Sequence, residues 1–499
     1  MSEYLTGRVS PIDLSADEFR RAGHDLIDDL ADLLDGVRDR PVTSGDDPSA
    51  VWQRLVARDL PEDGRPANEI VKQAFEVLRD GSLLNGHPKF FGYITASAAP
   101  IGILGDLLAA GINPNVGGWP LSPTASAIEL QTVDWIAQLI GYPTPCGGLL
   151  CSGGNVANML CFWAARRWKF GAGIRQRGTG DRRLTAYASS ATHTWLQKAS
   201  DLSGLGTDTV RMVKVGDDER MDVDDLRRMI EQDVAAGAEP FIVVASGGTV
   251  STGAVDPIIE TSELCKEKGL WLHVDGAYGA FAAALPEADP DLKALSLADS
   301  IALDPHKWLY APMEAGCALV RDRQLLYDAF LFRPPYYRFD EHKSGEYVNF
   351  FELGIQNSRG FRALKVWLAL QQVGRNGYVE SIRQDIALAK AMGEAAEQAP
   401  DIEFRSQRLS IVVYRYVPTD LQPGESTKSY LNELNEEILR RMQAGGEVFV
   451  SNAVSEDDYL LRACVVNFRT QLADALAAIT VAQRLGQEID REMRPAKLR

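Results

Sequence analysis

Asp304-Pro305-His306-Lys307-Trp308 directly follows the apolar run Ser300-Ile301-Ala302-Leu303. An earlier run of the same kind, Leu270-Trp271-Leu272-His273-Val274, ends in Asp275. Short apolar runs of this length are typical of buried strands. A lysine and an aspartate that end two such strands predict a chemical site at one edge of a sheet, because ligands bind in the crevice beyond strand ends.

Strands and helices alternate over the central part of the chain, from about residue 98 to 375. The sequence predicts helices over 101–111, 124–141, 222–236 and 257–268. It also predicts strands at 184–188, 210–214, 241–245, 270–274, 299–303 and 315–320. This alternation favours an α/β fold with a mostly parallel sheet that helices cover on both faces.

The two flanking parts differ from this central region. Residues 11–40 and 67–80 read as helices, the first with a capping box of Ser15 and Glu18. They are too few for a core of their own, so we expect them to pack on a partner subunit. A helix at 377–398, strands at 409–416, 446–451 and 459–466, and a helix at 470–492 predict a smaller α+β domain. The expected division is therefore 1–98, 99–375 and 376–499.

The composition is that of a globular protein. The chain has 499 residues, 45% of them hydrophobic, and 52 basic against 69 acidic residues give a net charge of −17. This acidity argues against nucleic acid or anionic membranes as partners, and no apolar run approaches the ~18 residues of a membrane span. The N-terminus lacks the basic and apolar regions of a signal peptide. We therefore expect a cytoplasmic protein.

The cysteines form no CxxC pair, so the sequence predicts neither a metal site nor a disulfide framework. We expect reduced thiols, most of them in the core. They are Cys146, Cys151, Cys161, Cys265, Cys317 and Cys464.

Lys307 and Asp275 together suggest pyridoxal 5'-phosphate (PLP) as a cofactor. Taken singly, Lys307 could be a surface lysine, and Asp275 could cap a helix or form a salt bridge. In an apolar setting, however, a lysine has a lowered pKa and its free amine can attack an aldehyde. A buried aspartate needs a partner, and the pyridinium nitrogen of PLP is such a partner.

Two further segments fit a flat, phosphorylated cofactor. Ser152-Gly153-Gly154-Asn155 precedes a predicted helix that runs through Trp168, and N–H groups at a helix start can bind phosphate. Because Gly-Gly before a helix is common, this turn gains its meaning from Lys307 and Asp275. His193 follows the strand at 184–188 and could either cap a helix or stack on the cofactor.

These residues form part of a pattern that resembles the group II PLP-dependent decarboxylases, which include aromatic-L-amino-acid decarboxylase and glutamate decarboxylase. The resemblance covers about residues 12–485. Its markers are His87-Pro88-Lys89-Phe90-Phe91-Gly92-Tyr93, the helix start from Ser122-Pro123 to Glu129, Ser152-Gly153-Gly154, His193, His273-Val274-Asp275, Asp304-Pro305-His306-Lys307-Trp308 and Asn357-Ser358-Arg359-Gly360-Phe361-Arg362.

The resemblance implies the fold of aspartate aminotransferase (PLP fold type I), with a seven-stranded sheet in the large domain. It also implies a homodimer with shared active sites. Lys307 would hold the cofactor covalently, Asp275 would bind the pyridine nitrogen, and His193 would stack on the ring. Thr249 lies in the segment near the ring hydroxyl, and Thr95 matches a substrate-side threonine. The phosphate would be bound by Gly154, Asn155, Asp304 and His306.

Three positions depart from the family's pattern. Asn155 stands where a serine is usual, and Val250 replaces the second threonine of a Gly-Thr-Thr segment. Asp304 replaces the asparagine of the animal enzymes. A carboxylate near a phosphate is unfavourable unless it points away or pairs with a cation.

Tyr336, within the predicted loop 333–347, matches a tyrosine that protonates the α-carbon after CO2 leaves. Tyr337 is adjacent, so the register could differ by one residue. Related aldehyde synthases have phenylalanine at this place and oxidise the intermediate instead. Tyr336 together with His193 therefore favours simple decarboxylation.

The resemblance also indicates residues near the substrate. Asn115-Val116-Gly117-Gly118-Trp119 matches a partner-subunit loop that lines the side-chain pocket, where animal aromatic decarboxylases have bulkier residues. Gly117 and its neighbour could make room for a large ring or only loosen the loop. Trp119 and Tyr93 would form an aromatic wall or part of the core. Because this loop has no arginine for an acidic substrate, we expect tryptophan, phenylalanine or tyrosine.

Three alternatives remain open. The first is an aldehyde synthase of the same fold, and the second is a lyase or desulfurase, for which the loop 333–347 lacks a cysteine. The third is a non-catalytic homologue that acts as a binding subunit. Retention of Lys307, Asp275, His193 and Tyr336 argues against the third.

Overall fold

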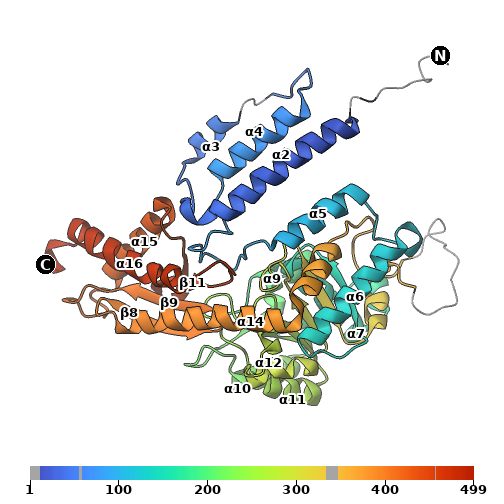
Figure 1. The fold of residues 1–499 in the computed structure, drawn as a ribbon. Helices are drawn as coiled ribbons and strands as arrows, with labels where there is room; N and C mark the ends of the chain where they lie inside the picture. Colours follow the sequence, from blue (N-terminus) through green and yellow to red (C-terminus); the bar gives the residue numbers. More distant parts are fainter. Residues whose placement is uncertain (1–9, 11, 56–58, 333–346, 456, 499) are drawn as a thin grey trace.

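A seven-stranded sheet forms the centre of the larger part of the molecule, and the N-terminal helices and the C-terminal part lie beside that part (Figure 1). The structure, a computed structural model, describes residues 10, 12–55, 59–332, 347–455 and 457–498. The strand order is β1-β7-β6-β5-β4-β2-β3. The strands are β1 (Gly147–Cys151), β2 (Leu184–Ser189), β3 (Val210–Val213), β4 (Glu239–Ser246), β5 (Trp271–Asp275), β6 (Ser300–Leu303) and β7 (Gly316–Val320).

The strands β3, β2, β4, β5 and β6 run parallel, and β7 runs antiparallel to both β6 and β1. This arrangement confirms the mostly parallel α/β sheet. The periodicity missed β1, whose first residues are Gly147 and Gly148. A Cβ on Gly148 would lie 2.6 Å from Val133 Cγ1. Close packing against a helix therefore requires glycine where strand propensity would favour a branched residue.

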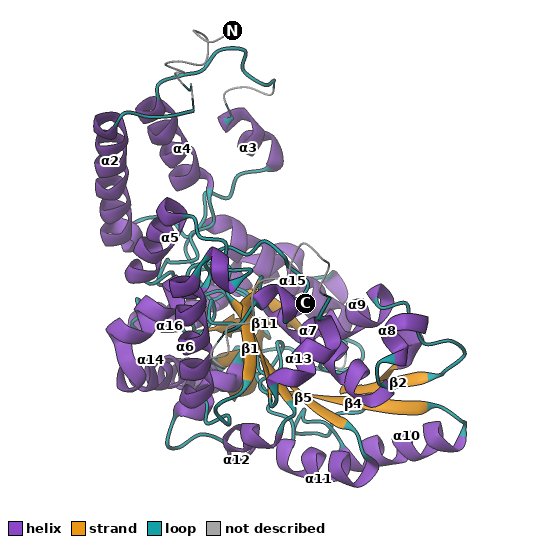
Figure 2. Cartoon of the chain, turned by 90° about the vertical axis from the view of Figure 1, so that its right-hand side faces the viewer, coloured by secondary structure: helices purple, strands orange, loops and turns teal. Residues whose placement is uncertain are grey.

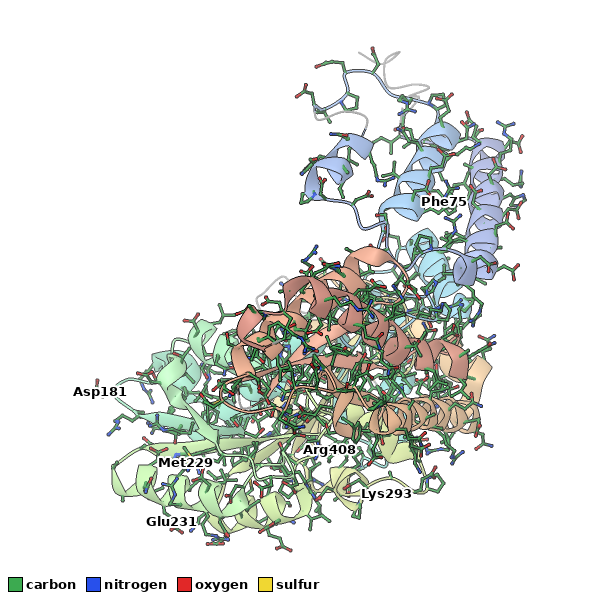
Figure 3. All side chains as sticks on the ribbon, turned by 90° about the vertical axis from the view of Figure 1, so that its left-hand side faces the viewer. Phe75, Asp181, Met229, Glu231, Lys293 and Arg408 are labelled. Carbon is green, nitrogen blue, oxygen red and sulfur yellow. The ribbon has the colours of Figure 1, made fainter. Side chains whose placement is uncertain are left out.

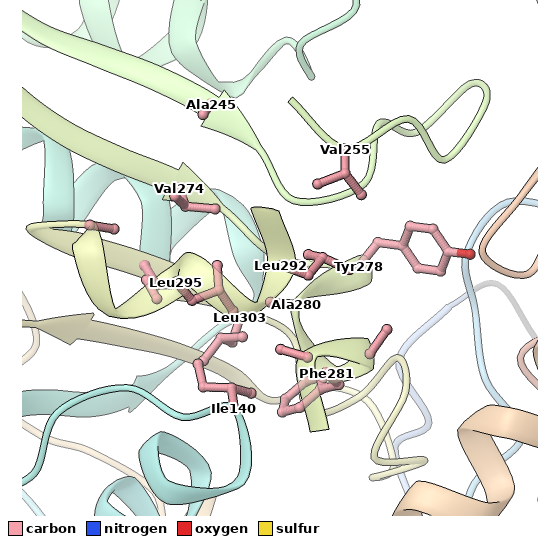
Figure 4. Packing of buried hydrophobic residues seen from close by; sticks show 14 of the residues in the cluster. Ile140, Ala245, Val255, Val274, Tyr278, Ala280, Phe281, Leu292, Leu295 and Leu303 are labelled. Carbon is pink, nitrogen blue, oxygen red and sulfur yellow. The ribbon is translucent and has the colours of Figure 1, made fainter. Parts of the chain in front are cut away.

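Helices cover both faces of this sheet (Figure 2). One face packs on α7 (Gly154–Phe170), and the other packs on α6 (Pro123–Leu139), α10 (Val223–Ala235) and α11 (Ile258–Lys268). Successive residues of β4 alternate between the two cores, with Val244 on the α7 side and Val243 and Ala245 on the other. Figure 4 shows part of the second core, in which Val274 and Leu303 meet the turn after β5.

A second, four-stranded antiparallel sheet belongs to the C-terminal part, with the order β10-β11-β9-β8. Its elements are β8 (Ile402–Arg408), β9 (Ile411–Tyr416), β10 (Ser451–Ser455), β11 (Asp458–Cys464), α15 (Lys428–Gly445) and α16 (Leu472–Met493). The long helix α14 (Ala363–Gln398) packs on β8 and β9 of this sheet and on α6 of the larger part, and it is interrupted at Gly374, beside the expected boundary at 375. The division into three independent domains stays a prediction.

The sequence-based boundaries were wrong at three places in this part. The strand expected at 446–451 begins only at Ser451, because Gly446 ends α15 in the left-handed conformation and Phe449 pairs with Phe90 in an isolated bridge. The sequence also missed β8, whose half-buried residues Glu403–Arg408 are mostly polar, and α15. The small α+β character of this part was nevertheless predicted.

The N-terminal helices project away from the rest of the chain (Figures 1 and 2). They are α2 (Ala16–Asp35), α3 (Pro48–Arg54) and α4 (Ala67–Gly81). Ser15 and Glu18 form the expected capping box, with Ser15 Oγ 2.6 Å from the Glu18 carboxylate. In α2 only Ala22 is buried, and α4, which carries Phe75 in Figure 3, has no buried residue. Two packed helices thus leave most of their surface exposed within one chain.

A buried ion pair accounts for two of the sequence markers. Arg359 donates to the Glu129 carboxylate at 2.5 Å, and both side chains are almost fully buried. Arg359 also donates to the carbonyls of Val116 and Leu150, at 3.0 and 2.6 Å. The pair therefore ties α6, β1 and the loop at residues 115–119 together, and a buried charge of this kind needs all of these partners.

All six cysteines are buried free thiols, as expected. No helix in the described residues is long and apolar enough to cross a membrane. Within the same residues, no cluster of histidine, cysteine and acidic side chains could hold a metal ion. The cytoplasmic location and the absence of nucleic-acid partners stay predictions.

Candidate active site

A cavity of about 370 Å³ opens at the carboxyl ends of β4, β5 and β6. Parallel strands direct their carboxyl ends to the same sheet edge, so residues that are distant in sequence meet there. All eight expected cofactor-binding residues line this cavity. They are Gly154, Asn155, His193, Thr249, Asp275, Asp304, His306 and Lys307.

Lys307 lies next to a carboxylate, although the residues before and after its turn are mostly apolar. Its Nζ is 3.0 Å from Asp304 Oδ2, and 19% of its side chain is exposed. Asp304 is almost fully buried, and its second oxygen, Oδ1, has no hydrogen-bond partner. The unfavourable interaction expected between the Asp304 carboxylate and a cofactor phosphate is thus offset by the ion pair with Lys307. The two side chains can meet because the residues lie three positions apart in the turn after β6.

Asp275, the last residue of β5, is fixed by two donors. Its Oδ2 accepts a hydrogen bond from Trp195 Nε1 at 2.8 Å, and its Oδ1 accepts one from the Ala277 backbone N–H at 3.2 Å. Trp195 is fully buried, so its indole holds the carboxylate in one orientation. Among the residues that the structure describes, Asp275 neither caps a helix nor forms a salt bridge.

His193 follows β2 and faces the same cavity. Partial burial lowers the pKa of its imidazole, the nearby Lys307 ammonium acts in the same direction, and Asp275 acts in the opposite one. Its Nδ1 accepts a hydrogen bond from the Trp195 backbone N–H at 3.2 Å. The ring is therefore neutral near pH 7, with its proton assigned to Nε2.

The glycine turn lies at the start of α7. Gly153 has a φ of 86°, which glycine adopts without strain. A Cβ on Gly154 would lie 2.7 Å from Asp304 Oδ2, so the absence of a side chain lets Asp304 approach. His306 Nδ1 lies 2.7 Å from the Ala315 carbonyl, which fixes its ring beside this turn. The first N–H groups of the helix thus border the cavity and suit an anion.

Thr249 lines the cavity, but its hydroxyl is bonded within its own loop. Its Oγ1 lies 3.1 Å from Thr252 Oγ1 and accepts from the Ala254 N–H at 3.1 Å. Val250 is 40% exposed at the same loop. A contact of this loop with a ring hydroxyl stays a prediction.

The four expected substrate residues do not line this cavity; among residues 93–95, only Ile94 does. Tyr93 is 58% exposed, and Trp119 lies against Tyr347, with ring centroids 6.0 Å apart. A Cβ on Gly117 would lie 2.0 Å from the Asn357 carbonyl oxygen. Close packing therefore requires glycine at position 117, and the interpretations of Gly117 as extra room for a ring or as a looser loop stay predictions. Within one chain, Thr95, Tyr93, Trp119 and Gly117 stay unassigned to the cavity.

Tyr336 and Tyr337 lie outside the described residues. The site also contains residues that the sequence reasoning did not identify. Asp275 depends on Trp195, whose only sequence signal is its place two residues after His193. Tyr278, three residues after Asp275, lines the cavity as well.

A buried polar chain behind the cavity fixes α7 to the strands. His273 lies 2.7 Å from Asn158 Oδ1 through Nε2 and 2.8 Å from Ser300 Oγ through Nδ1. Complete burial lowers the pKa of His273 to about 4, so the ring is neutral. Asn158 lies one helical turn after Gly154 and lines the cavity. This histidine is structural, although it belongs to one of the family markers.

Comparison with known proteins identifies the family. A model of the pyridoxal-dependent decarboxylase conserved domain matches residues 49–417, well over half of the chain. The chain belongs to this family. An aromatic-L-amino-acid decarboxylase of Bacillus atrophaeus is 30% identical over 479 residues, which cover 96% of this chain and 97% of that protein.

Two further proteins are similar to this decarboxylase along nearly the whole chain. A phenylacetaldehyde synthase of Petunia hybrida is 31% identical, and the match covers 91% of each chain. The crystal structure of Oryza sativa TDC with PLP and tryptamine has a TM-score of 0.88 at 27% identity and covers 97% of this chain and 100% of that one. These similarities confirm the expected family and fold type.

PLP is the cofactor of the family, and the cavity of this decarboxylase fits it. The lining offers an amine for an aldehyde, a fixed carboxylate for a ring nitrogen, a neutral imidazole for a ring face, and N–H groups for a phosphate. Asp304 carries a charge that opposes a phosphate, and its ion pair with Lys307 offsets that charge.

Replacing Gly316 by alanine is expected to weaken PLP binding by about tenfold or more. A Cβ on Gly316 of β7 would lie 2.5–2.6 Å from the backbone of Gly153, so the phosphate-facing turn must shift. The dissociation constant is measured by titrating the apoprotein with PLP. Gly424→Ala, with open space around the added methyl, is the matched control. An unchanged constant in a folded Gly316→Ala protein would show that the turn does not bind the phosphate.

Proposed function

We propose that this chain decarboxylates an aromatic L-amino acid to the amine and CO2. The observation that carries the proposal is the meeting of the Lys307 amine and the fixed Asp275 carboxylate in one cavity. When bound, PLP supplies an electron sink for the bond that breaks at the substrate α-carbon. The remaining chemistry belongs to the side chains of the protein.

In this proposal, Lys307 is the covalent anchor, since its amine is the nucleophile on the cavity wall. Asp275 keeps the ring nitrogen protonated, and its two donors hold it in orientation without neutralising its charge. His193 stacks on the ring as a neutral imidazole. The start of α7, with Gly154 and Asn155, binds the phosphate, and His306 borders it.

Aromatic substrates are favoured by two observations. The Bacillus atrophaeus relative is named for aromatic amino acids, and the Petunia hybrida relative for phenylacetaldehyde. The loop 115–119 offers Trp119 and no cation for an acidic side chain. Because this loop does not line the cavity of its own chain, we infer that it serves the cavity of a partner subunit, with Thr95 and Tyr93 near the same entrance.

Release of CO2 from each of the twenty amino acids, with PLP added, tests the substrate class. We expect tryptophan, phenylalanine or tyrosine to give the highest kcat/KM. Lys307→Ala should lose turnover and the visible absorbance of bound PLP. Normal turnover by Lys307→Ala would refute the anchor, absence of CO2 release from every amino acid would favour a non-catalytic binding subunit, and a preference for glutamate would refute the aromatic class.

The residue that donates a proton to the α-carbon decides between decarboxylation and aldehyde synthesis. We propose Tyr336 for this role from the family resemblance. In the presence of dissolved O2 as the oxidant, Tyr336→Phe is expected to shift the product from amine toward aldehyde, ammonia and hydrogen peroxide, with O2 and water consumed, because the α-carbon then lacks its acid. Product ratios are measured by chromatography, with Tyr337→Phe as the neighbouring control. An unchanged ratio in Tyr336→Phe would move the acid role to another residue.

We infer that two copies of the chain form a homodimer through the N-terminal helices and α5 (Pro100–Ile112). One face of α5, with Gly102 and Gly105, packs closely on Pro312 and α14. The opposite face exposes 49–69% of Leu104, Leu107, Leu108 and Ile112, at spacings of three and four residues. An apolar stripe of this kind beside two projecting amphipathic helices favours a protein partner of equal apolar character.

The mass of the protein in solution tests this dimer. Light scattering is expected to give twice the 54.7 kDa of one chain. Leu107→Asp should lower the mass to that of one chain, because the carboxylate would be desolvated in the contact. Leu202→Asp, at a 71% exposed leucine of α9 (Trp195–Leu202), should leave the mass unchanged. A monomeric wild-type protein would refute the shared active sites.

A further inference from the structure

The turn that carries Lys307 is followed by aromatic residues that do not line the cavity but pack behind it. Trp308 is fully buried and stacks on Tyr278, with ring centroids 4.9 Å apart and an interplanar angle of 21°. Tyr278 in turn lines the cavity and belongs to the buried cluster shown in part in Figure 4. The segments after Lys307 and after Asp275 therefore touch through these two rings.

A single buried carboxylate accepts hydrogen bonds from this segment. Asp385 Oδ2 lies 2.9 Å from Trp308 Nε1 and 2.7 Å from the Tyr310 hydroxyl. Asp385, on the part of α14 beyond the interruption at Gly374, is 2% exposed. The Asn467 backbone N–H donates to the same carboxylate. Helix α14 thus reaches the residue directly after Lys307.

The backbone of this segment is held at both ends. The Lys307 N–H donates to the Asp304 carbonyl at 2.8 Å, and the Tyr310 N–H donates to the Lys307 carbonyl at 3.1 Å. Tyr378 of α14 donates its hydroxyl to the Leu309 carbonyl at 3.1 Å. Tyr310 has a φ of 53°, a conformation that a non-glycine residue keeps only when its surroundings fix it.

The carboxylate relies on these donors because no cation balances it. In the described part of the chain, Asp385 forms no salt bridge with lysine, arginine or histidine. The ionisable groups that interact with it are Tyr310 and Cys464. Burial raises the pKa of Asp385 to about 7, while the hydrogen bonds from Tyr310 and Trp308 act against that rise. A buried acid that is held by hydrogen bonds in this way can fix its donor side chains in one specific arrangement.

We propose that Asp385 is a positioning residue that fixes the turn carrying Lys307, through its hydrogen bonds to Trp308 and Tyr310. The inference rests on the proposed role of Lys307 as the covalent anchor. A covalently held cofactor is productive only in a narrow range of orientations, and a shift of about 1 Å can cost a hundredfold in rate. The C-terminal part of the chain would thereby set the geometry of a residue in the large sheet domain.

Tyr310→Phe is the sharpest test, because it removes one hydroxyl from the Asp385 carboxylate and keeps the ring. Tyr414→Phe is the matched control. Tyr414 is also buried, in β9, and donates its hydroxyl to the Ala478 carbonyl at 3.1 Å, remote in sequence from the Lys307 turn. The two variants lose the same group from buried sites, so a general loss of stability should be similar in both.

In the PLP-loaded protein, Tyr310→Phe is expected to weaken the circular dichroism of the visible PLP band and to speed PLP dissociation. It should lower kcat about tenfold and change KM less than twofold, as expected for a misplaced reacting group. Tyr414→Phe should leave all four quantities unchanged and lower only the urea midpoint. Asp385→Asn combined with Tyr310→Phe should lose less than the sum of the single losses, since both act through one contact.

Equal behaviour of Tyr310→Phe and Tyr414→Phe, with only the urea midpoint lowered, would overturn the role of Asp385. If Tyr310→Phe does not fold, Trp308→Phe provides the same readouts, because it removes the indole N–H from Asp385 and keeps an aromatic ring. Failure of the proposed function is seen separately. If Lys307 is not the covalent anchor, borohydride treatment of the wild-type protein will leave PLP unattached to Lys307, whatever the behaviour of the variants.

Discussion

The register between parallel strands is the constraint on which the site depends. Ser246, Asp275 and Ala302 are paired across β4, β5 and β6, so the three strands end at nearly the same height. Whatever follows these strands must enter one crevice. Asp275 reaches it as the last residue of β5, and Lys307 reaches it after a turn of a few residues beyond β6.

The antiparallel strand β7 lies between β6 and β1 and completes this part of the sheet. It begins beside the glycine turn, where Gly316 lies directly against Gly153, and runs back along β6 away from the Lys307 turn. Asp304 then fills the space that Gly154 leaves, and its carboxylate pairs with Lys307. Glycines at these places are needed for close approach of backbone to backbone or to a side chain, and not for flexibility.

The sequence could predict the parts of the site that local pattern controls. Apolar runs indicated five of the parallel strands and β7, and the residues just after them supplied Lys307, Asp275 and His193. It could not predict Trp195 as the partner of Asp275, because 80 residues separate them, nor the pair of Arg359 and Glu129, separated by 230. The missed strands β1 and β8 are glycine-containing or largely polar, and tertiary packing overrides their weak propensity.

The small C-terminal sheet also contacts the segments that carry the chemistry. Ser410, between β8 and β9, lies 2.7 Å from the Tyr278 hydroxyl through its own hydroxyl, and a Cβ on Gly279 would lie 2.7 Å from Leu409 Cδ1. Together with Asp385, this turn braces the residues after Asp275 and after Lys307 from one side. Because both braces come from the C-terminal part, any shift of that part relative to the large sheet would move both segments together.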